Sequence, residues 1–288
     1  MSAEEHCFKK KKKGRSFLQK AKKFGRQGQR GRGTEIEQDQ YDYLVRVLER
    51  WRQDFESEEE RTIFVENVMR EMEGKERQIC GNQLGSRVIE MLLPSAEQSV
   101  LSQYSDCLAQ DLRLVCLDPF MSHVLEKLLL LQSFVSQPSQ TGLVEAGRDW
   151  VVKVSKFVTN NVEDFSNDSY ASHLLRTCCE CLVGQRIGER ERANQARTEG
   201  YETRTVWRFK DDQQTVSLCD EVLETFSSRL SSLPGDTLMS ELCVRVLTVF
   251  CQLANTEHHQ HLSTAVISHL LSGVLSQGVD TEDIISVR

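Results

Sequence analysis

A short pattern that occurs three times in this 288-residue sequence constrains its fold more than any other feature. Each copy has a serine, a His or Arg, two apolar residues, a charged residue, one variable residue and two further apolar residues. The copies lie at residues 86–93, 122–129 and 172–179. Because positions three and four residues apart share one face of an α-helix, the two apolar pairs predict a buried face. The serine, the residue after it and the charged residue are expected together on the exposed face.

The spacing of the copies indicates a structural repeat of 36 residues. Ser86 and Ser122 are 36 residues apart, whereas Ser122 and Ser172 are 50 apart, which fits one repeat plus an insertion. A fourth, degenerate copy is expected at 241–245, where the serine, Ser240, stands one position early. Repeats of this length are typical of solenoids, in which each unit packs on its neighbours.

Helical periodicity extends through most of the sequence after residue 34. Two stretches interrupt it, at 132–147 and 184–214, and we interpret both as insertions between helices. The sequence has no Asn-Gly or Asp-Gly hairpin signal and no convincing pair of strands. The predicted fold is therefore all-α, a right-handed α-solenoid over 35–288. We expect helices near 41–48, 58–73, 84–93, 95–110, 119–132, 147–163, 169–183, 216–232, 237–254 and 259–275, and repeats near 60–111, 112–165, 166–232 and 236–275.

The net charge of −7 combines two segments of opposite sign. Residues 1–33 contain twelve Lys and Arg against two acids, a net charge of +10. The other 255 residues contain 24 Lys and Arg against 41 acids, a net charge of −17. The Lys-, Arg- and Gly-rich composition of 1–34 buries too little apolar surface to fold, so we predict a disordered basic arm. Its densest cations are expected to bind importin and to attract phosphates: Lys9, Lys10, Lys11, Lys12, Lys13 and Arg15.

Several functional classes are disfavoured by what the sequence lacks. The first residues have no apolar stretch of a secretory signal, so we expect the ten cysteines to be reduced in the cytosol or nucleus. No segment has the ~20 predominantly apolar residues that span a bilayer. No phosphate-binding loop, H-E-x-x-H motif or G-x-S-x-G motif occurs, so we expect neither an enzyme nor a cofactor.

Two clusters resemble metal sites only in part. Cys178 and Cys181 form a C-x-x-C pair, but a zinc site normally needs a second ligand pair at suitable spacing. Because Cys178 and Cys179 occupy an apolar pair of the repeat, we interpret them as small core residues. The other cluster is expected to be exposed at the start of a helix: His258, His259 and His261.

The stretch CGNQLGSRVIEMLL, residues 80–93, resembles the helical core of a Pumilio-type (PUF) repeat. In that family a Ser-Arg-x-x-Glu pattern occupies the base-reading helix. The basic start, the degenerate repeats and the long charged insertions resemble one branch in particular, the nucleolar Pumilio-like proteins that bind pre-ribosomal RNA during small-subunit maturation. The resemblance is good over 60–185 and looser over 216–275. Family members carry more repeats, so we expect this chain to be an N-terminal portion.

The resemblance implies that the exposed residues of the copies bind single-stranded RNA, at about one base per repeat. A carboxylate can accept from both donors of the guanine Watson–Crick edge, and a flat Arg or His can stack between bases. The first two copies are therefore expected to prefer guanine, and Arg176 of the third to meet phosphate. Taken singly, the serines also suit a helix cap or first turn, and the glutamates suit solvated positions. The expected RNA-binding residues are Ser86, Arg87, Glu90, Ser122, His123, Glu126, Ser172, His173 and Arg176.

From this resemblance we expect a monomeric RNA-binding protein of the nucleus and nucleolus that acts in pre-rRNA processing. Its expected partners are single-stranded or partly structured pre-rRNA, pre-ribosomal particle proteins and importin. One alternative is a HEAT- or armadillo-like scaffold that binds proteins, and another is a cytoplasmic PUF-type regulator of mRNA. HEAT and armadillo repeats run to about 40–47 residues, so the 36-residue spacing disfavours the scaffold. The basic arm and the insertions disfavour the cytoplasmic regulator.

Overall fold

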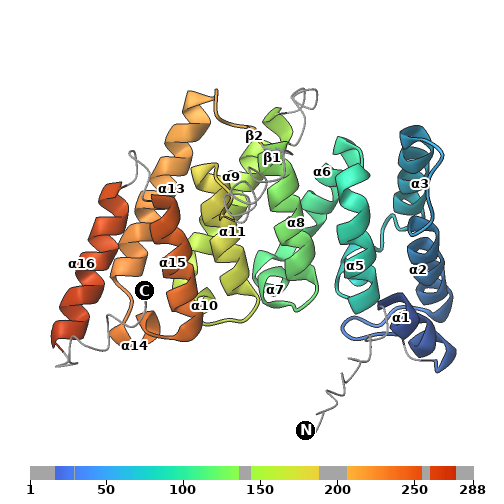
Figure 1. Cartoon of the computed structure of the whole chain (residues 1–288), viewed down its shortest axis with the longest axis horizontal. Coiled ribbons are helices and arrows are strands. Elements are labelled where there is room, and N and C mark those ends of the chain that lie inside the picture. The colour runs from blue at the N-terminus through green and yellow to red at the C-terminus, as the bar shows by residue number, and fades with distance from the viewer. Residues whose placement is uncertain (1–16, 29, 136–143, 188–205, 255–259, 277–288) are drawn as a thin grey trace, which may run out of the picture.

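The computed structural model describes residues 17–28, 30–135, 144–187, 206–254 and 260–276, which form a row of helices (Figure 1). Along the row, one arrangement of three helices recurs, with a short helix between two longer ones. The triplets are α3 (Glu58–Glu71), α4 (Glu76–Cys80), α5 (Gln83–Leu92); α6 (Gln98–Leu108), α7 (Leu112–Leu117), α8 (Met121–Ser133); α9 (Val144–Asn160), α10 (Val162–Phe165), α11 (Ala171–Val183); and α13 (Gln213–Ser231), α14 (Gly235–Leu238), α15 (Glu241–Ala254). They are flanked by α1 (Phe17–Arg26), α2 (Gln38–Trp51) and α16 (Gln260–Ser276), and 3₁₀ turns follow α5 and α6 at η1 (Leu93–Ser95) and η2 (Ala109–Asp111).

The all-α prediction is confirmed, and each expected helix begins and ends within four residues of an observed one. The four shortest helices, α4, α7, α10 and α14, were not expected, because four to six residues are too few to show helical periodicity. The triplets span 58–92, 98–133, 144–183 and 213–254, so they begin and end at other residues than the expected repeat ranges.

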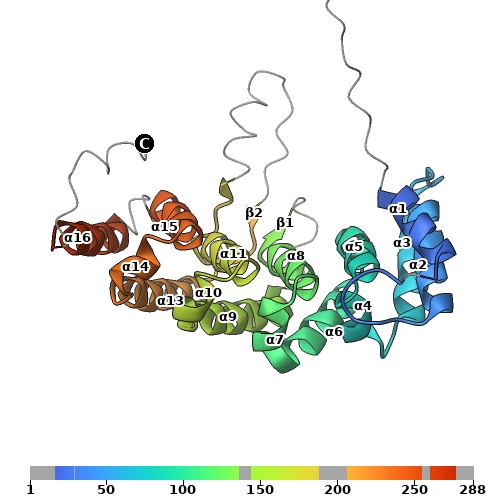
Figure 2. The same cartoon turned by 90° about the horizontal axis from the view of Figure 1, so that it is seen from below.

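The last helix of each triplet lies on the same side of the row. Helix α5 packs beside α8, α8 beside α11, and α11 beside α15. Figure 2 shows these four helices along one side of a gently curved row, with α6, α9 and α13 on the opposite side. We call the surface formed by α5, α8, α11 and α15 the third-helix face.

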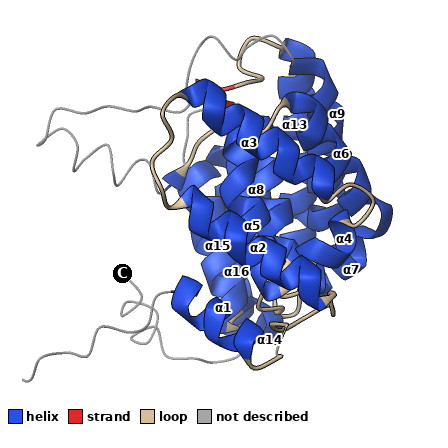
Figure 3. Ribbon diagram, turned by 90° about the vertical axis from the view of Figure 1, so that its right-hand side faces the viewer, coloured by secondary structure: helices blue, strands red, loops and turns tan. Residues whose placement is uncertain are grey.

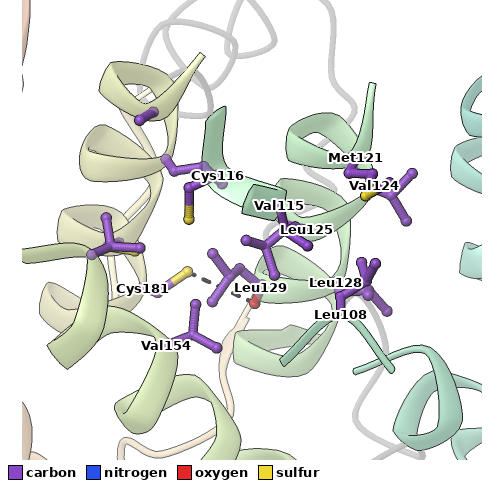
Figure 4. Packing of buried hydrophobic residues seen from close by; sticks show 14 of the residues in the cluster. Leu108, Val115, Cys116, Met121, Val124, Leu125, Leu128, Leu129, Val154 and Cys181 are labelled. Carbon is purple, nitrogen blue, oxygen red and sulfur yellow. Dashed lines mark hydrogen bonds between the residues drawn. The ribbon is translucent and has the colours of Figure 1, made fainter. Parts of the chain in front are cut away.

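The apolar pairs of the repeat form the core between neighbouring triplets. In α8, Val124, Leu125, Leu128 and Leu129 are fully buried. Figure 4 shows them among buried residues of the preceding and following helices, such as Leu108, Val115 and Val154. The equivalent pairs of α5 and α11 are fully buried too, which confirms the predicted buried face. Since a buried Leu or Val contributes about 1.5–3 kcal/mol, these pairs supply much of the stabilisation between repeats.

One small sheet corrects the expectation that the chain has no strand pair. Strand β1 (Phe134–Val135) pairs antiparallel with β2 (Val206–Trp207), so residues from the two predicted insertions meet (Figure 3). Gly184 ends α11 in the left-handed conformation, with φ of 73°, directly beneath Trp207. A Cβ at this position would lie 2.4 Å from the indole ring, so only glycine lets the second insertion leave α11 here.

The basic N-terminal segment corrects a second expectation. Residues 1–16, with Lys9 to Lys13 and Arg15, lie outside the described residues. Residues 17–26, however, are helical, and α1 packs on α2 with Ala21 buried. Half-buried Phe17 and Leu18 complete this contact. The prediction of disorder through residue 34 is therefore wrong for α1 and for 30–34, because three apolar side chains on one side of α1 find a partner in α2.

Two further findings concern the described residues as a whole. No helix among them is long and apolar enough to cross a membrane. Their nine cysteines are free thiols, and seven of these are buried.

Candidate nucleic-acid interface

Each third helix begins with the same capping geometry. The side-chain oxygen of Asn82 accepts hydrogen bonds from Leu84 and Gly85 N–H at 2.9 and 3.3 Å. The carboxylates of Asp118 and Asp168 make the equivalent pairs of bonds, all at 2.8 Å, to the second and third residues after them. Four residues after each cap, the backbone N–H of the repeat's serine donates to the cap carbonyl. These bonds satisfy donors that a helix start otherwise leaves unpaired, and they fix the register of the residues that follow.

A similar cap, with one side-chain bond in place of two, sets the register of the fourth repeat. Ser240 Oγ accepts from Cys243 N–H at 3.3 Å, and Val244 N–H donates to the Ser240 carbonyl at 2.9 Å. Ser240 is therefore the cap, equivalent to Asn82, and Val244 takes the place of the repeat's serine. The expected register, with residue 241 in the serine's position, is corrected by three residues. Arg245 and Thr248, both exposed, are the outward residues of this repeat.

The serines do not project into solvent as expected. Ser86, Ser122 and Ser172 are between 1% and 4% exposed. Each serine is three residues before a buried apolar residue and four before a half-buried charged one, so it lies at the border between the two faces. Its short side chain is covered there. All three serines therefore fit the alternative interpretation, in which they are structural residues of the first helical turn and do not contact a base.

The other six expected residues do lie on the third-helix face. Arg87 and His173 are exposed, and the remaining four are partly exposed: Glu90, His123, Glu126 and Arg176. Their charges interact along the face, since the fields of both His123 and Arg245 act on His173, in the helix between them. The structure thus brings side chains of α5, α8, α11 and α15 into one continuous row. We call this row the strip; it consists of Arg87, Glu90, His123, Glu126, His173, Arg176 and Arg245 and the residues between them on the same face.

A pocket of about 150 Å³ lies on this strip, between α8 and α11. Helix α8 contributes His123, Glu126 and the largely buried Ser122. Helix α11 contributes His173, and the turn before it contributes Tyr170. The pocket therefore brings together expected RNA-binding residues of two consecutive repeats, two of which are histidines, and adds the aromatic ring of Tyr170. Flat rings and a carboxylate around a small hollow are suited to hold one planar polar group.

The carboxylates of the strip are held in different ways. Glu126 Oε1 accepts from Thr177 Oγ1 at 2.9 Å, a bond from α11 to α8 that fixes the side chain. Burial raises the pKa of Glu90 above its ordinary value, although nearby Arg87 and His123 act to lower it. Arg87 approaches one oxygen of Glu90 at 3.5 Å, while the buried Oε1 has no hydrogen-bond partner among the described residues. Glu90 therefore presents to the face only the oxygen near Arg87, because Oε1 is closed off from solvent.

Partial burial changes the pKa values of the histidine and the arginine of the third repeat. Burial lowers the pKa of His173, and the positive charge of Arg176 lowers it further. Arg176 itself donates through Nε to the Ser172 carbonyl at 3.3 Å, which draws its guanidinium against α11. At neutral pH His173 is therefore an uncharged ring, able to stack on another flat group.

Two residues of the strip were missed in the sequence. Lys127 is half-buried on α8, and burial together with the charge of Arg186 lowers its pKa, although Glu90 and Glu126 act to raise it. Arg245 is the second, and lies within the fourth copy expected at 241–245 but at another position of the repeat. The signal that reveals it is the cap: Asn82, Asp118 and Asp168 each precede the repeat's first position by four residues, as Ser240 precedes Val244.

The two possible metal clusters behave differently in the structure. Cys178, Cys179 and Cys181 are fully buried, which confirms that the first two are core residues. Burial raises the pKa of the Cys181 thiol to about 12, and its Sγ donates to the Leu129 carbonyl at 3.7 Å (Figure 4). Among the described residues, no three potential metal ligands gather. His261 is exposed on α16, and the other two histidines, His258 and His259, lie outside the described residues.

Comparisons with known proteins agree with this arrangement. A family model described as "NOP9-like PUF repeat domain" matches residues 74–273. The Homo sapiens protein named Nucleolar protein 9 is 26% identical over 250 residues, which cover 79% of this chain and 38% of the relative. Its Mus musculus counterpart is 24% identical over 251 residues, which cover 80% of this chain and 39% of the relative. The chain thus spans less than half the length of these curated relatives.

A solved structure described as "Structure of APUM23-GGAUUUGACGG" shares the fold. It superposes with a TM-score of 0.53 at 18% identity, over 83% of this chain and 43% of that one. The prediction of a PUF solenoid, drawn from residues 80–93 and the 36-residue spacing, is confirmed by the family match. This chain belongs to the NOP9-like PUF repeat family.

Proposed function

We propose that the third-helix face binds single-stranded RNA and that the protein acts on pre-ribosomal RNA in the nucleolus during small-subunit biogenesis. One observation carries the proposal, the pocket in which His123 and Glu126 of one repeat meet His173 of the next. Proteins that bind single strands stack bases on flat side chains, and an imidazole on each side of a hollow provides two such surfaces.

The carboxylates of the face supply the base-reading chemistry. Glu90 and Glu126 stand at the same position of successive repeats, four residues after the buried serine. An ionised carboxylate is an acceptor only, and it pairs well with the two adjacent N–H donors of guanine. The half-buried carboxylate of Glu90 can offer Oε2, which lies 3.5 Å from Arg87, whereas its Oε1 is buried. Ser122 lines the pocket, whereas we do not assign Ser86 and Ser172 to base edges, because they are buried and do not line it.

The cations of the face resolve a difficulty in the charge distribution. A body of charge −17 repels RNA unless its basic groups are gathered locally. Arg87, Lys127, Arg176 and Arg245 are gathered in this way, on α5, α8, α11 and α15. They are placed to meet phosphates while the glutamates between them meet bases.

The cellular role rests on the relatives. The human and mouse proteins are named Nucleolar protein 9, and the family match covers most of the repeats. We infer a nucleolar location, monomeric binding to pre-rRNA with pre-ribosomal proteins as neighbours, and import directed by Lys9 to Lys13 and Arg15. The 36-residue spacing and the shared caps disfavour a HEAT- or armadillo-like scaffold. A cytoplasmic mRNA regulator is disfavoured by the nucleolar relatives.

The test compares the full chain with its Glu90→Gln and Glu126→Gln double variant. Fluorescence anisotropy at about 150 mM salt, where non-specific contacts weaken, measures binding to a guanine-containing strand, its adenine counterpart and a duplex. We expect the wild-type chain to prefer the guanine strand by about tenfold or more and the double variant to lose this preference. Equal binding of all three ligands by both proteins would exclude a base-reading face.

A further inference from the structure

We propose that α1 is a second RNA-binding element, a docked helix that holds the phosphodiester backbone beside the first repeat. This inference rests on the proposed function of the third-helix face and extends it. It concerns a folded part of the basic segment, and it does not depend on residues 1–16.

The exposed side of α1 carries an unpaired row of cations. Lys20, Lys23 and Arg26 are exposed and lie three residues apart, so they follow one another along one side of the helix. Among the described residues none of the three forms an ion pair. Lys22, on a neighbouring side, is paired with Glu49 of α2. Three free cations along a helix of this length give a local positive patch on an otherwise acidic body.

The apolar side of α1 is fixed to the body. Ala21 is buried, and its carbonyl accepts a hydrogen bond at 3.2 Å from the hydroxyl of Tyr41, a buried residue of α2. A basic amphipathic helix binds lipid surfaces by inserting its apolar side. In α1 that side is already occupied by α2, so a bilayer is disfavoured and the outward cations define the ligand as a polyanion.

The segment after α1 attaches it to the start of the third-helix face. Asn82 Nδ2 donates to the carbonyls of Arg30 and Thr34 at 2.8 and 2.9 Å. Gln83 N–H donates to the Arg32 carbonyl at 2.9 Å, and Thr34 N–H to the Gly81 carbonyl at 2.8 Å. Asn82 is also the cap of α5, whose Arg87 begins the strip one turn later. Asn82 therefore positions both α5 and residues 30–34, which we call the strap because they connect α1 to the start of α5.

Gly33 shows how closely this strap is fitted. Its φ is 88°, in the left-handed region, and a Cβ there would lie 2.1 Å from the Gly81 carbonyl oxygen. Residues 30–34 are therefore held closely against the start of α5, and α1 itself is held by its contacts with α2. Figures 2 and 3 agree on the place of α1, since both show it on the same side of the row as α5 and α15.

The chemistry of the patch fits RNA phosphates. Lysine ammonium groups bind phosphate as point charges and carry no sequence information. A strand held at Arg87 and Glu90 can continue onto Lys20, Lys23 and Arg26. The patch is then expected to add affinity without base preference, because contacts to phosphates carry no sequence information.

The test changes three cations on α1 and three on the opposite side of the row. The first variant is Lys20→Gln, Lys23→Gln and Arg26→Gln, which leaves Lys22 and its partner intact. The matched control is Lys153→Gln, Lys156→Gln and Arg229→Gln, again two lysines and one arginine, exposed on α9 and α13. Both are made in the full chain, and circular dichroism confirms that each remains folded.

Affinity is measured over a series of salt concentrations with a fluorescein-labelled single-stranded RNA of mixed sequence, about 20 nucleotides long. Three lost phosphate contacts should weaken binding by about tenfold or more at ~150 mM salt and flatten the logarithmic salt dependence by about 2. We expect both the weaker binding and the flatter salt dependence from the α1 variant alone, and we expect that variant to keep its preference for guanine. Equal loss in the control variant, or no loss in the α1 variant, would overturn the proposal.

The outcomes separate this proposal from the proposed function. If the α1 variant binds like the wild type while Glu90→Gln with Glu126→Gln loses guanine preference, only the α1 proposal fails. If the wild type shows no base preference, the function of the third-helix face fails, whatever α1 does. If the α1 variant binds RNA normally but accumulates less in nuclei, α1 is an importin signal and the RNA proposal is wrong.

Discussion

His123 of α8 and His173 of α11 line the same pocket, although one belongs to the second repeat and the other to the third. The repeat places them there, because each is the fifth residue after an aspartate that caps its helix. A base that enters the pocket can stack between them, and this geometry is the basis of the first prediction.

Replacing either histidine with alanine should weaken RNA binding, and replacement with phenylalanine should largely preserve it. Stacking contributes about 1–3 kcal/mol per base, which corresponds to roughly 5- to 150-fold in affinity. Anisotropy on His123→Ala, His173→Ala and the two phenylalanine variants checks this. His269→Ala on α16 is the control, since His269 lies outside the pocket. If all the histidine variants bind like the wild type, no base stacks there.

Glu90→Gln should stabilise the folded chain at neutral pH. Burial raises the pKa of Glu90 above its ordinary 4.5, so the folded state binds its proton more readily than the unfolded state does. The stability that this shift contributes is complete below about pH 4.5 and is lost as the pH rises through the folded value. An uncharged amide avoids the loss, so we expect a gain of up to about 1 kcal/mol near pH 7.

The gain should disappear below about pH 4.5, which urea denaturation at several pH values would show. Glu163→Gln is the control, because Glu163 is exposed on α10. A Glu90→Gln variant that is less stable than the wild type at pH 7 would show that the carboxylate has a partner in the folded state.

Asn82→Ala should destabilise the chain more than the loss of an ordinary helix cap. Its side chain caps α5 and also donates to the Arg30 and Thr34 carbonyls. We expect a cost of about 2–3 kcal/mol, against ~1 kcal/mol for Ser57→Ala, which removes only a cap from α3. Urea denaturation measures both. Equal costs would show that the strap contributes nothing to stability.

Arg245→Ala should weaken RNA binding about three- to tenfold, because one cationic contact is lost. Arg245 occupies the position equivalent to Arg87, His123 and His173 only in the register set by Ser240. Arg229→Ala, on the opposite side of the row, should have no effect. The fourth repeat would prove not to bind RNA if these two arginine variants behaved alike in an anisotropy titration.

Much of the fold could be predicted because the information is local. Apolar pairs four residues apart predict the helices, and the 36-residue interval between Ser86 and Ser122 predicts the solenoid. The short helix α7 and its counterparts escaped prediction, because so few residues show no periodicity. Helix α1 was missed for another reason. Its lysines and the glycines around it are typical of disorder, and the tertiary contacts with α2, such as that of Ala21 with Tyr41, are not visible in the local sequence.

The candidate site could be predicted in part. Arg87, Glu90, His123 and Glu126 lie where the pattern places them, because the pattern follows the helical period. The burial of Ser122 could not be read from that period, since a residue at the border between two faces is covered or exposed according to its neighbours in the next helix. The pocket is likewise tertiary, because it forms only where α8 meets α11.

The most direct test of the central claim maps where RNA lies on the protein. The full chain is photocrosslinked to a 4-thiouridine-containing single strand, and the crosslinked peptides are identified by mass spectrometry. We predict crosslinks in α8 and α11, at or beside His123 and His173, that disappear with an unlabelled competitor strand. Crosslinks confined to α9 and α13, on the opposite side of the row, would contradict the claim that the third-helix face binds RNA.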